Sequence, residues 1–261
     1  MTLIDSKRVT GRFLDSEQYT ELSIRAYEAV YGRDFVSPGG ESMARELIDR
    51  LDLEPGSRVL DAGCGLGGSA FLMARELGAL VDAMDLSRNM IEMARRKCEE
   101  HGLDGRVVLE HGDCLALARP RRYDAVYSRD VFLHIHDKAK LFGVLLDALR
   151  PGGRLLFTDY CCGGRPWSEE FSRYVEDRAY SLHTLPEYEA LLQAAGFVDV
   201  ASHDLTSRFR EILEAELHRI RHADLDDPTR AKLEAGWQAK LQRARAGDQR
   251  WGLLEARRAE N

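Results

Sequence analysis

The residues best suited to chemistry are a group of glycines between two carboxylates. Residues 59–69 read Val-Leu-Asp-Ala-Gly-Cys-Gly-Leu-Gly-Gly-Ser, so an apolar run ends near Asp61 and leads into a glycine-dense turn at Gly63. Glycines allow a sharp turn and let a ligand approach the backbone closely. Asp85 ends a second apolar run 22 residues after Gly63, where a carboxylate can accept hydrogen bonds from both hydroxyls of a ribose. This combination predicts a nucleoside-containing cofactor.

The order of residues in the turn indicates which cofactor. A dinucleotide site would read G-x-G-x-x-G and leave helix N–H groups free for a pyrophosphate. Here the turn reads G-C-G-L-G-G, and the carboxylate of Asp61 before it would repel pyrophosphate but attract a cation. The D-x-G-x-G-x-G pattern resembles the first motif of the class I S-adenosylmethionine (AdoMet) methyltransferases, whose cofactor carries an ammonium and a sulfonium. The alternative is a strand–turn–helix whose glycines serve packing alone, and the coincidence of strand, turn, helix and distal acid favours the cofactor.

Polar residues also end the next two predicted strands, where ligands bind in an open α/β sheet. Asp113 is placed to accept a hydrogen bond from an adenine amine and the backbone of Cys114 to bind a ring nitrogen, although a plain turn is the alternative. The fourth strand leads through Asp130 to His134 and His136. An acid and a histidine beside a sulfonium predict binding of a small amine and removal of its proton, because only the free amine attacks a methyl carbon. For His136, a packing or capping role is the better interpretation.

The elements around these residues predict an α/β fold. Helical patterns alternate with five apolar runs, which lie at 57–62, 80–85, 106–110, 123–128 and 153–159. Such alternation indicates βαβ units and a parallel sheet. Two later strands near 197–200 and 250–256, separated by a charged helical region, predict a reversed hairpin at the sheet's edge. We expect one domain over residues 1–261, with a helical cap at 1–50 and a helical insert at 207–246.

Composition and charge limit the function classes. A formal net charge of −7 without a basic block disfavours a nucleic-acid partner. No apolar run is long enough to span a bilayer, and the first seven residues have no secretory apolar core, so we expect a cytoplasmic protein away from membranes. The five cysteines include no C-x-x-C pair, so neither a metal site nor a disulfide framework is predicted. We expect the chain to act as a monomer.

Segments along nearly the whole chain carry a more specific resemblance. They are Gln18-Tyr19-Thr20, Tyr127-Ser128-Arg129-Asp130, Leu133-His134, Thr158-Asp159-Tyr160-Cys161, Tyr174-Val175, Arg178-Ala179-Tyr180, Gly236-Trp237 and Arg250-Trp251-Gly252. They resemble the phosphoethanolamine N-methyltransferases of protozoa, nematodes and plants, which methylate phosphoethanolamine three times to give phosphocholine. The resemblance implies a class I methyltransferase fold: a Rossmann-like, mostly parallel seven-stranded sheet with helices on both faces. It also implies AdoMet as the cofactor and S-adenosylhomocysteine (AdoHcy) as the product.

The resemblance assigns roles residue by residue. Tyr19 and His134 match the family's catalytic pair, in which the tyrosine holds the substrate and the histidine assists deprotonation of the amine. The residues matching the surroundings of the amine are Gln18, Tyr27 and Asp130, where ring faces and a carboxylate suit a methylated cation. Those matching the phosphate site are Tyr160, Arg178 and Tyr180. Those matching cofactor contacts are Ser37, Asp61, Gly63, Asp85, Leu86, Asp113, Cys114 and Arg129.

One position departs from the family pattern. The family carries a phosphate-binding lysine that aligns five residues beyond Trp237, and Gln242 stands there, with Lys240 and Arg243 close by. Either one of these bases compensates, or the substrate is less anionic than a phosphomonoester. The alternatives are therefore an N-methyltransferase for another small zwitterion, such as an aminophosphonate, aminosulfonate or amino acid, or a catalytically silent AdoMet-binding module. The presence of Tyr19, Asp130 and His134 together disfavours the silent module.

Overall fold

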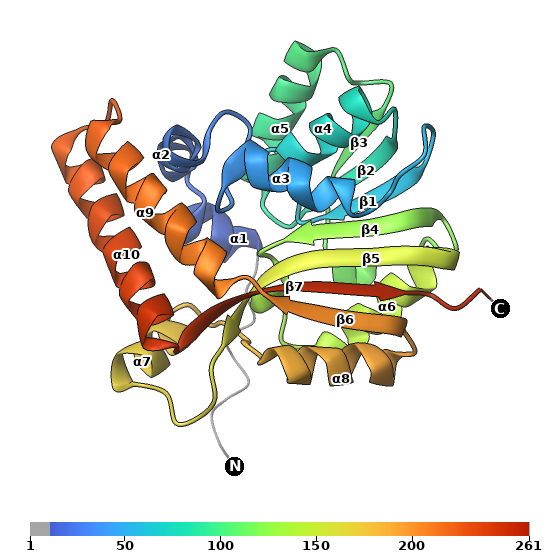
Figure 1. The fold of residues 1–261 in the computed structure, drawn as a ribbon. Helices are drawn as coiled ribbons and strands as arrows, with labels where there is room; N and C mark the ends of the chain where they lie inside the picture. The colour runs from blue at the N-terminus through green and yellow to red at the C-terminus, as the bar shows by residue number, and fades with distance from the viewer. Residues whose placement is uncertain (1–10, 261) are drawn as a thin grey trace.

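The computed structural model describes residues 11–260, and its centre is one seven-stranded sheet (Figure 1). The strand order is β3-β2-β1-β4-β5-β7-β6; β7 runs antiparallel to both neighbours, and the other pairs are parallel. The strands are β1 (Arg58–Ala62), β2 (Leu80–Asp85), β3 (Val107–His111), β4 (Tyr123–Arg129), β5 (Leu149–Cys162), β6 (Val198–Asp204) and β7 (Gln249–Arg257). The predicted class I methyltransferase fold, with its mostly parallel sheet and reversed final hairpin, is confirmed.

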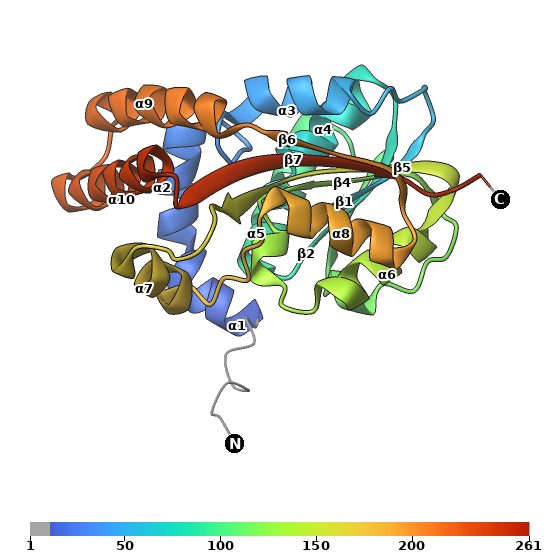
Figure 2. The same ribbon diagram turned by 60° about the horizontal axis from the view of Figure 1, so that its bottom comes forward.

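Helices cover both faces of the sheet (Figure 2). One apolar core joins the sheet to α3 (Gly40–Asp49), α4 (Gly68–Glu76) and α5 (Arg88–His101). A second core joins the other face to α6 (Lys138–Ala148) and α8 (Leu185–Ala195). No helix within residues 11–260 is both long and apolar enough to cross a membrane.

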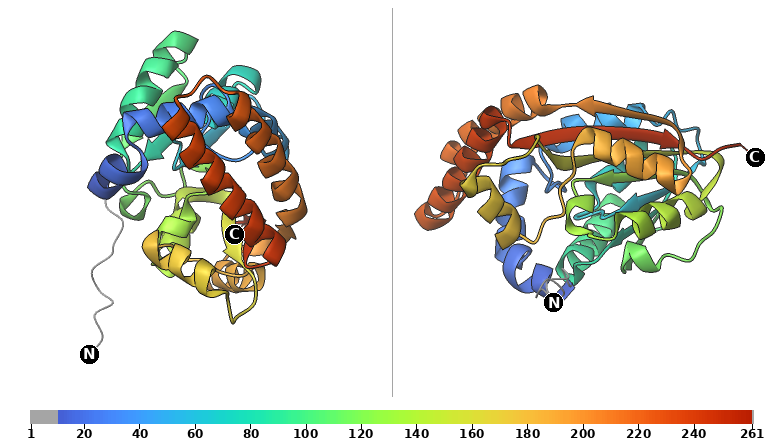
Figure 3. Two further views of the ribbon diagram at one scale, coloured as in Figure 1. Left: turned by 90° about the vertical axis from the view of Figure 1, so that its left-hand side faces the viewer. Right: turned by 90° about the horizontal axis from the view of Figure 1, so that it is seen from below.

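A further group of helices gathers beyond the carboxyl ends of the parallel strands (Figures 1 and 3). It comprises α1 (Gly11–Phe13) with the following π-helical turn (Leu14–Gln18), α2 (Glu21–Tyr31), α7 (Glu169–Asp177), α9 (Thr206–His222) and α10 (Asp227–Ala246). In the chain, α9 and α10 lie between β6 and β7. The predicted cap begins at residue 1, and residues 1–10 of it lie outside the described part of the chain.

Local chemistry explains where the elements differ from the predicted ones. The charged region 207–246 is two helices, because Asp226 caps a new helix by accepting a hydrogen bond from the backbone of Thr229, and Pro228 sits in its first turn. The fifth strand continues to Cys162, since its end pairs with Gln249 of β7. The helix α7 and the turns before α2 were not predicted.

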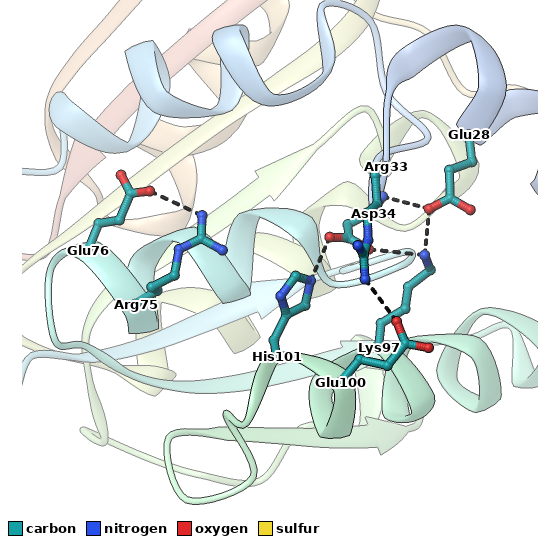
Figure 4. Close-up of polar contacts among 8 residues, drawn as sticks. All are labelled: Glu28, Arg33, Asp34, Arg75, Glu76, Lys97, Glu100 and His101. Carbon is teal, nitrogen blue, oxygen red and sulfur yellow. Dashed lines mark hydrogen bonds and ion pairs between the residues drawn. The ribbon is translucent and has the colours of Figure 1, made fainter.

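A half-buried ion network ties the N-terminal layer to the sheet domain (Figure 4). Lys97 of α5 contacts Glu28 of α2 at 2.5 Å and Asp34 at 3.0 Å. His101 contacts the other oxygen of Asp34 at 2.8 Å, and the backbone of Asp34 donates a hydrogen bond to Glu28. The loop that follows α2 is therefore fixed against α5.

Candidate active site

A cavity of about 1140 Å³ lies between the carboxyl ends of the parallel strands and the helices gathered there. All the predicted site residues line it except Asp61, which lines a small hollow beside it. The cavity and the hollow share residues of the glycine turn and of the loop before α3. The structure therefore brings together in one place residues that are spread from Gln18 to Tyr180.

The glycine turn is shaped by backbone geometry that other residues would disturb. Gly63, Gly65 and Gly67 all have positive φ, at 82°, 53° and 89°. A Cβ on Gly63 would come within 2.3 Å of the side chain of Val131, so an alanine there would force a shift. The turn leaves a narrow cradle open at the end of β1, where a cofactor can approach.

Asp85 is fixed at the tip of β2 by two backbone hydrogen bonds. Its carboxylate accepts one from Gly65 at 2.9 Å and one from Ser87 at 2.8 Å. Burial raises the pKa of this carboxyl, and the two backbone N–H groups oppose the rise. Since a carboxylate has about four acceptor sites, Asp85 retains capacity to accept ribose hydroxyls from the cavity.

Asp61 is a buried acid whose Oδ2 has no hydrogen-bond partner. Burial raises the pKa of Asp61 to about 7, with Asp85 adding to the rise and Arg129 opposing it. Such a group is costly to ionise alone, so a cation placed beside it would be strongly favoured. The buried carboxylate of Asp61 therefore fits the ammonium group of AdoMet.

Two further predicted cofactor residues have structural partners of their own. Asp113 accepts a hydrogen bond from the backbone of Leu115 and so caps the short turn that carries Cys114. Burial raises the pKa of the Cys114 thiol to about 12, so it is a neutral group and no nucleophile. Arg129 donates to the carbonyl oxygens of Pro38 at 2.6 Å and Gly40 at 3.1 Å. It thus holds the loop that carries Ser37, while Leu86 lines the cavity after Asp85.

Asp130 presents a carboxylate to the cavity from an uncommon backbone conformation. Its φ of 56° lies in the left-handed region, and its Oδ1 accepts a hydrogen bond from the indole of Trp251 at 2.7 Å. Its Oδ2 is buried without a partner, and burial raises the pKa of this carboxyl. Trp251 was not predicted to have a role, yet it orients this acid.

His134 lies on a 3₁₀ turn after β4, with its Nδ1 buried and unpartnered. Burial lowers the pKa of His134 to about 4, and the charges of Arg178 and Lys138 lower it further. The imidazole is therefore neutral at neutral pH and has a nitrogen able to accept a proton. Its ring packs edge-on against Tyr180 at 5.1 Å. Tyr19 shares the cavity, and burial raises the pKa of its phenol, which stays protonated.

Lys138 fixes the turn that carries His134. The residue is 3% exposed, and its ammonium donates to the carbonyl oxygens of Phe132, Ile135 and Ser181 at 2.9, 2.5 and 3.0 Å. Phe132 and Ile135 lie on either side of His134 in the chain, and Ser181 directly follows Tyr180. Nothing in its local sequence marks Lys138 as a link between the two segments, because its third partner, Ser181, lies 43 residues away.

The far side of the cavity is aromatic and cationic. The ammonium of Lys240 donates to the hydroxyl of Tyr160 at 3.1 Å and lies 4.7 Å above the ring of Trp237. Burial lowers the pKa of Lys240 to about 8. Arg178 lines the same side, and Tyr27 completes the aromatic wall.

Of the alternatives left open by Gln242, the geometry of α10 favours the one in which a neighbouring base compensates. Its side chain is exposed and does not line the cavity, whereas Lys240 and Arg243 do. A helix turns about 100° per residue, so a residue five positions after Trp237 points about 140° away from it, and one three positions after lies on the same face. The cationic position near Tyr160 is therefore filled, and helical periodicity could have identified Lys240 from the sequence.

Comparisons with known proteins agree with this arrangement. A family described as "Methyltransferase domain" matches residues 59–153. The phosphoethanolamine N-methyltransferase of Plasmodium falciparum is 33% identical over 267 residues, covering 98% of this chain and 99% of that protein. The enzyme of Triticum aestivum is 43% identical over 253 residues, covering 93% of this chain but 49% of its own length, so the chain spans about half of this relative.

A solved phosphoethanolamine N-methyltransferase structure is also similar to this chain. Haemonchus contortus phosphoethanolamine N-methyltransferase 2, in complex with phosphomonomethylethanolamine and S-adenosylhomocysteine, superposes with a TM-score of 0.92 at 36% identity. The match covers 96% of this chain and 60% of that one.

Proposed function

We propose that this chain, which belongs to the phosphoethanolamine N-methyltransferase family, methylates phosphoethanolamine and its mono- and dimethyl forms towards phosphocholine, with AdoMet as methyl donor. One observation carries the proposal. The cavity and the small hollow beside it have buried acids at one end, lysine and arginine at the other, and a neutral histidine on the wall. A cationic cofactor, an amine and a phosphate are the three groups that such a distribution of charge would accept.

The cofactor end follows from the glycine turn and its acids. Asp61 would pair with the ammonium group, Asp85 would accept the ribose hydroxyls, and Asp113 with the backbone of Cys114 would hold the adenine. Gly63, Ser37, Leu86 and Arg129 would complete this half of the cavity. When bound, AdoMet supplies an electrophilic methyl group on a sulfonium. The chain's own part is to bind it beside the amine and to exclude water.

The substrate end would separate the phosphate from the amine. Lys240 and Arg178 supply positive charge for the phosphate, and Tyr160 and Tyr180 supply hydroxyl donors. Asp130, Gln18 and the ring of Tyr27 would surround the amine, which becomes a larger cation with each methylation. Tyr19 would hold the amine in place.

Deprotonation of the amine falls to His134. An ammonium group has no lone pair, so its proton must leave before the nitrogen can attack the methyl carbon. In the free protein the low pKa of His134 makes it a weak base. A bound phosphate would neutralise the charge of Arg178, which contributes to that low pKa, and would so raise the basicity of His134 when substrate is present.

A product assay tests the proposal. The protein is incubated with AdoMet and a panel of phosphoethanolamine, ethanolamine, 2-aminoethylphosphonate, taurine and glycine, and AdoHcy and methylated amines are measured by mass spectrometry. We expect AdoHcy to form with phosphoethanolamine far faster than with ethanolamine. Turnover of another amine alone would favour the other zwitterions, and AdoMet binding without turnover of any amine would favour a silent module. Light scattering would test the proposed monomer.

A further inference from the structure

A buried glutamate in the insert links the two halves of the cavity. Glu216 lies in the middle of α9 and is 0% exposed. Its Oε1 accepts a hydrogen bond from the backbone of Gly39 at 2.8 Å, and its Oε2 accepts one from the indole of Trp237 at 2.8 Å. An acid buried at this depth is costly unless both oxygens are paired, so the two partners are held firmly.

The first partner belongs to the cofactor half. Gly39 follows Ser37 and Pro38, which line the cavity, and it caps the start of α3. Arg129 holds the carbonyl oxygens on either side of Gly39, while Glu216 holds its N–H group. The backbone of this loop therefore has three fixed points, and α9 supplies one of them.

The second partner belongs to the substrate half. Trp237 lines the cavity, packs against Tyr31 at 5.5 Å and lies under the ammonium of Lys240. The negative charge of Glu216 is also the largest electrostatic contribution opposing the fall in the pKa of Lys240. Glu216 thus fixes the indole and supports the charge beside it.

We propose that Glu216 is a positioning residue that couples the two ligands, because one carboxylate fixes both the loop over the cofactor half and the indole beneath Lys240. The inference rests on the proposed function. Binding of AdoMet or AdoHcy steadies the loop at residues 36–40 and, through Glu216, the Trp237–Lys240 pair. The phosphorylated amine then binds a site that is already ordered, and by linkage the reverse also holds.

Calorimetry measures this coupling directly. The affinity for phosphoethanolamine is determined with and without saturating AdoHcy, which cannot support turnover. In the wild type we expect AdoHcy to strengthen binding about five-fold or more, within the usual range of coupling between sites. In Glu216→Gln the amide NH₂ must face the N–H of either Gly39 or Trp237. Because both are donors, one of the two hydrogen bonds is lost, and we expect the strengthening of phosphoethanolamine binding by AdoHcy to fall to a factor near one.

Two further variants make the test specific. Glu214→Gln, on the exposed side of the same helix, breaks only the ion pair with Arg245 and should keep the wild-type factor. Trp237→Phe keeps a ring and removes the indole N–H, so it should lower the factor even if Glu216→Gln fails to fold. This inference alone would be overturned if Trp237→Phe or Glu216→Gln kept the coupling factor of the wild type. It would also be overturned if the wild type bound both ligands but AdoHcy did not change the affinity for phosphoethanolamine. Binding of neither ligand by the wild type would overturn the proposed function and this inference with it.

Discussion

If Asp61 pairs with the ammonium group as proposed, we expect cofactor binding to depend on pH. Its pKa of about 7 in the free protein means that much of it is protonated near neutrality, and a bound ammonium group favours the carboxylate. Binding must then release a proton below pH 7. We expect AdoMet affinity to rise with pH between about 5 and 7, by up to about ten-fold per unit, and to level off above 7.

Calorimetry in buffers of different ionisation enthalpy would measure the number of protons released when AdoMet binds. Asp61→Asn keeps the shape and removes the titration, so it should bind more weakly and lose the slope. An Asp61→Asn variant that keeps the full slope would assign the proton to another group, such as Asp85.

His134 should affect turnover far more than binding. Replacing it with alanine removes the proton acceptor and leaves Lys240 and Arg178 in place, so kcat should fall about 10²–10⁴-fold with little change in KM. His136→Ala is the matched control, because that imidazole also lines the cavity but belongs to an exposed residue and hydrogen-bonds to the backbone carbonyl oxygen of Ala179. Proton NMR should place the titration of His134 near pH 4 in the free protein and higher with phosphoethanolamine bound. A midpoint near 6.5 without ligand would contradict the buried, neutral imidazole.

At the scale of elements, α10 gives a prediction that depends on helical geometry. Lys240 faces the cavity and Gln242 faces solvent, two residues apart on one helix. Lys240→Met should raise KM for phosphoethanolamine about 10–150-fold, the effect of losing one charge-assisted hydrogen bond of about 1.5–3 kcal/mol. Gln242→Lys adds a charge on the exposed face and should leave KM nearly unchanged. If Gln242→Lys lowered KM strongly, α10 would have to be rotated from the orientation described here.

The sheet could be predicted from the sequence, but the walls of the cavity could be predicted only in part. The strands from Arg58 to Cys162 are apolar runs with local stop signals, so periodicity identifies them. The positions of Asp61, Asp85 and Asp130 follow from the sheet, because the carboxyl ends of parallel strands share one edge. Contacts between residues that are far apart in the chain leave no local signal in the sequence. Trp251 orients Asp130 from 121 residues away, and Glu216 reaches Gly39 across 177.

At the scale of the whole molecule, the N-terminal layer forms part of the cavity's lining, so the cavity depends on how that layer is held against the sheet domain. Lys97 takes part in that attachment, since it bridges Glu28 and Asp34, and all three side chains are at most 20% exposed. Lys97→Met would remove the cation that two mostly buried carboxylates share, leaving Glu28 unpaired by a cation and Asp34 with His101 and, at 3.9 Å, Arg33. A buried carboxylate that loses its cation is a costly arrangement. Because the network is partly hydrated, we expect a loss of about 1–3 kcal/mol in the free energy of unfolding.

Arg33→Ala is the matched control for this attachment, because it breaks an ion pair with Glu100 whose side chains are 65% and 57% exposed (Figure 4) and, of the buried network, loses only a long contact of 3.9 Å with Asp34. An exposed pair contributes at most about 1 kcal/mol, so this variant should unfold almost as the wild type does. Urea titration followed by circular dichroism measures both. The loop after α2 also lines the cofactor half, so Lys97→Met should weaken AdoHcy binding as well, while Arg33→Ala should not. Equal stability of the two variants would mean that the buried apolar side chains of Ile24, Val30 and Tyr31 hold the N-terminal layer and that the ion network contributes little.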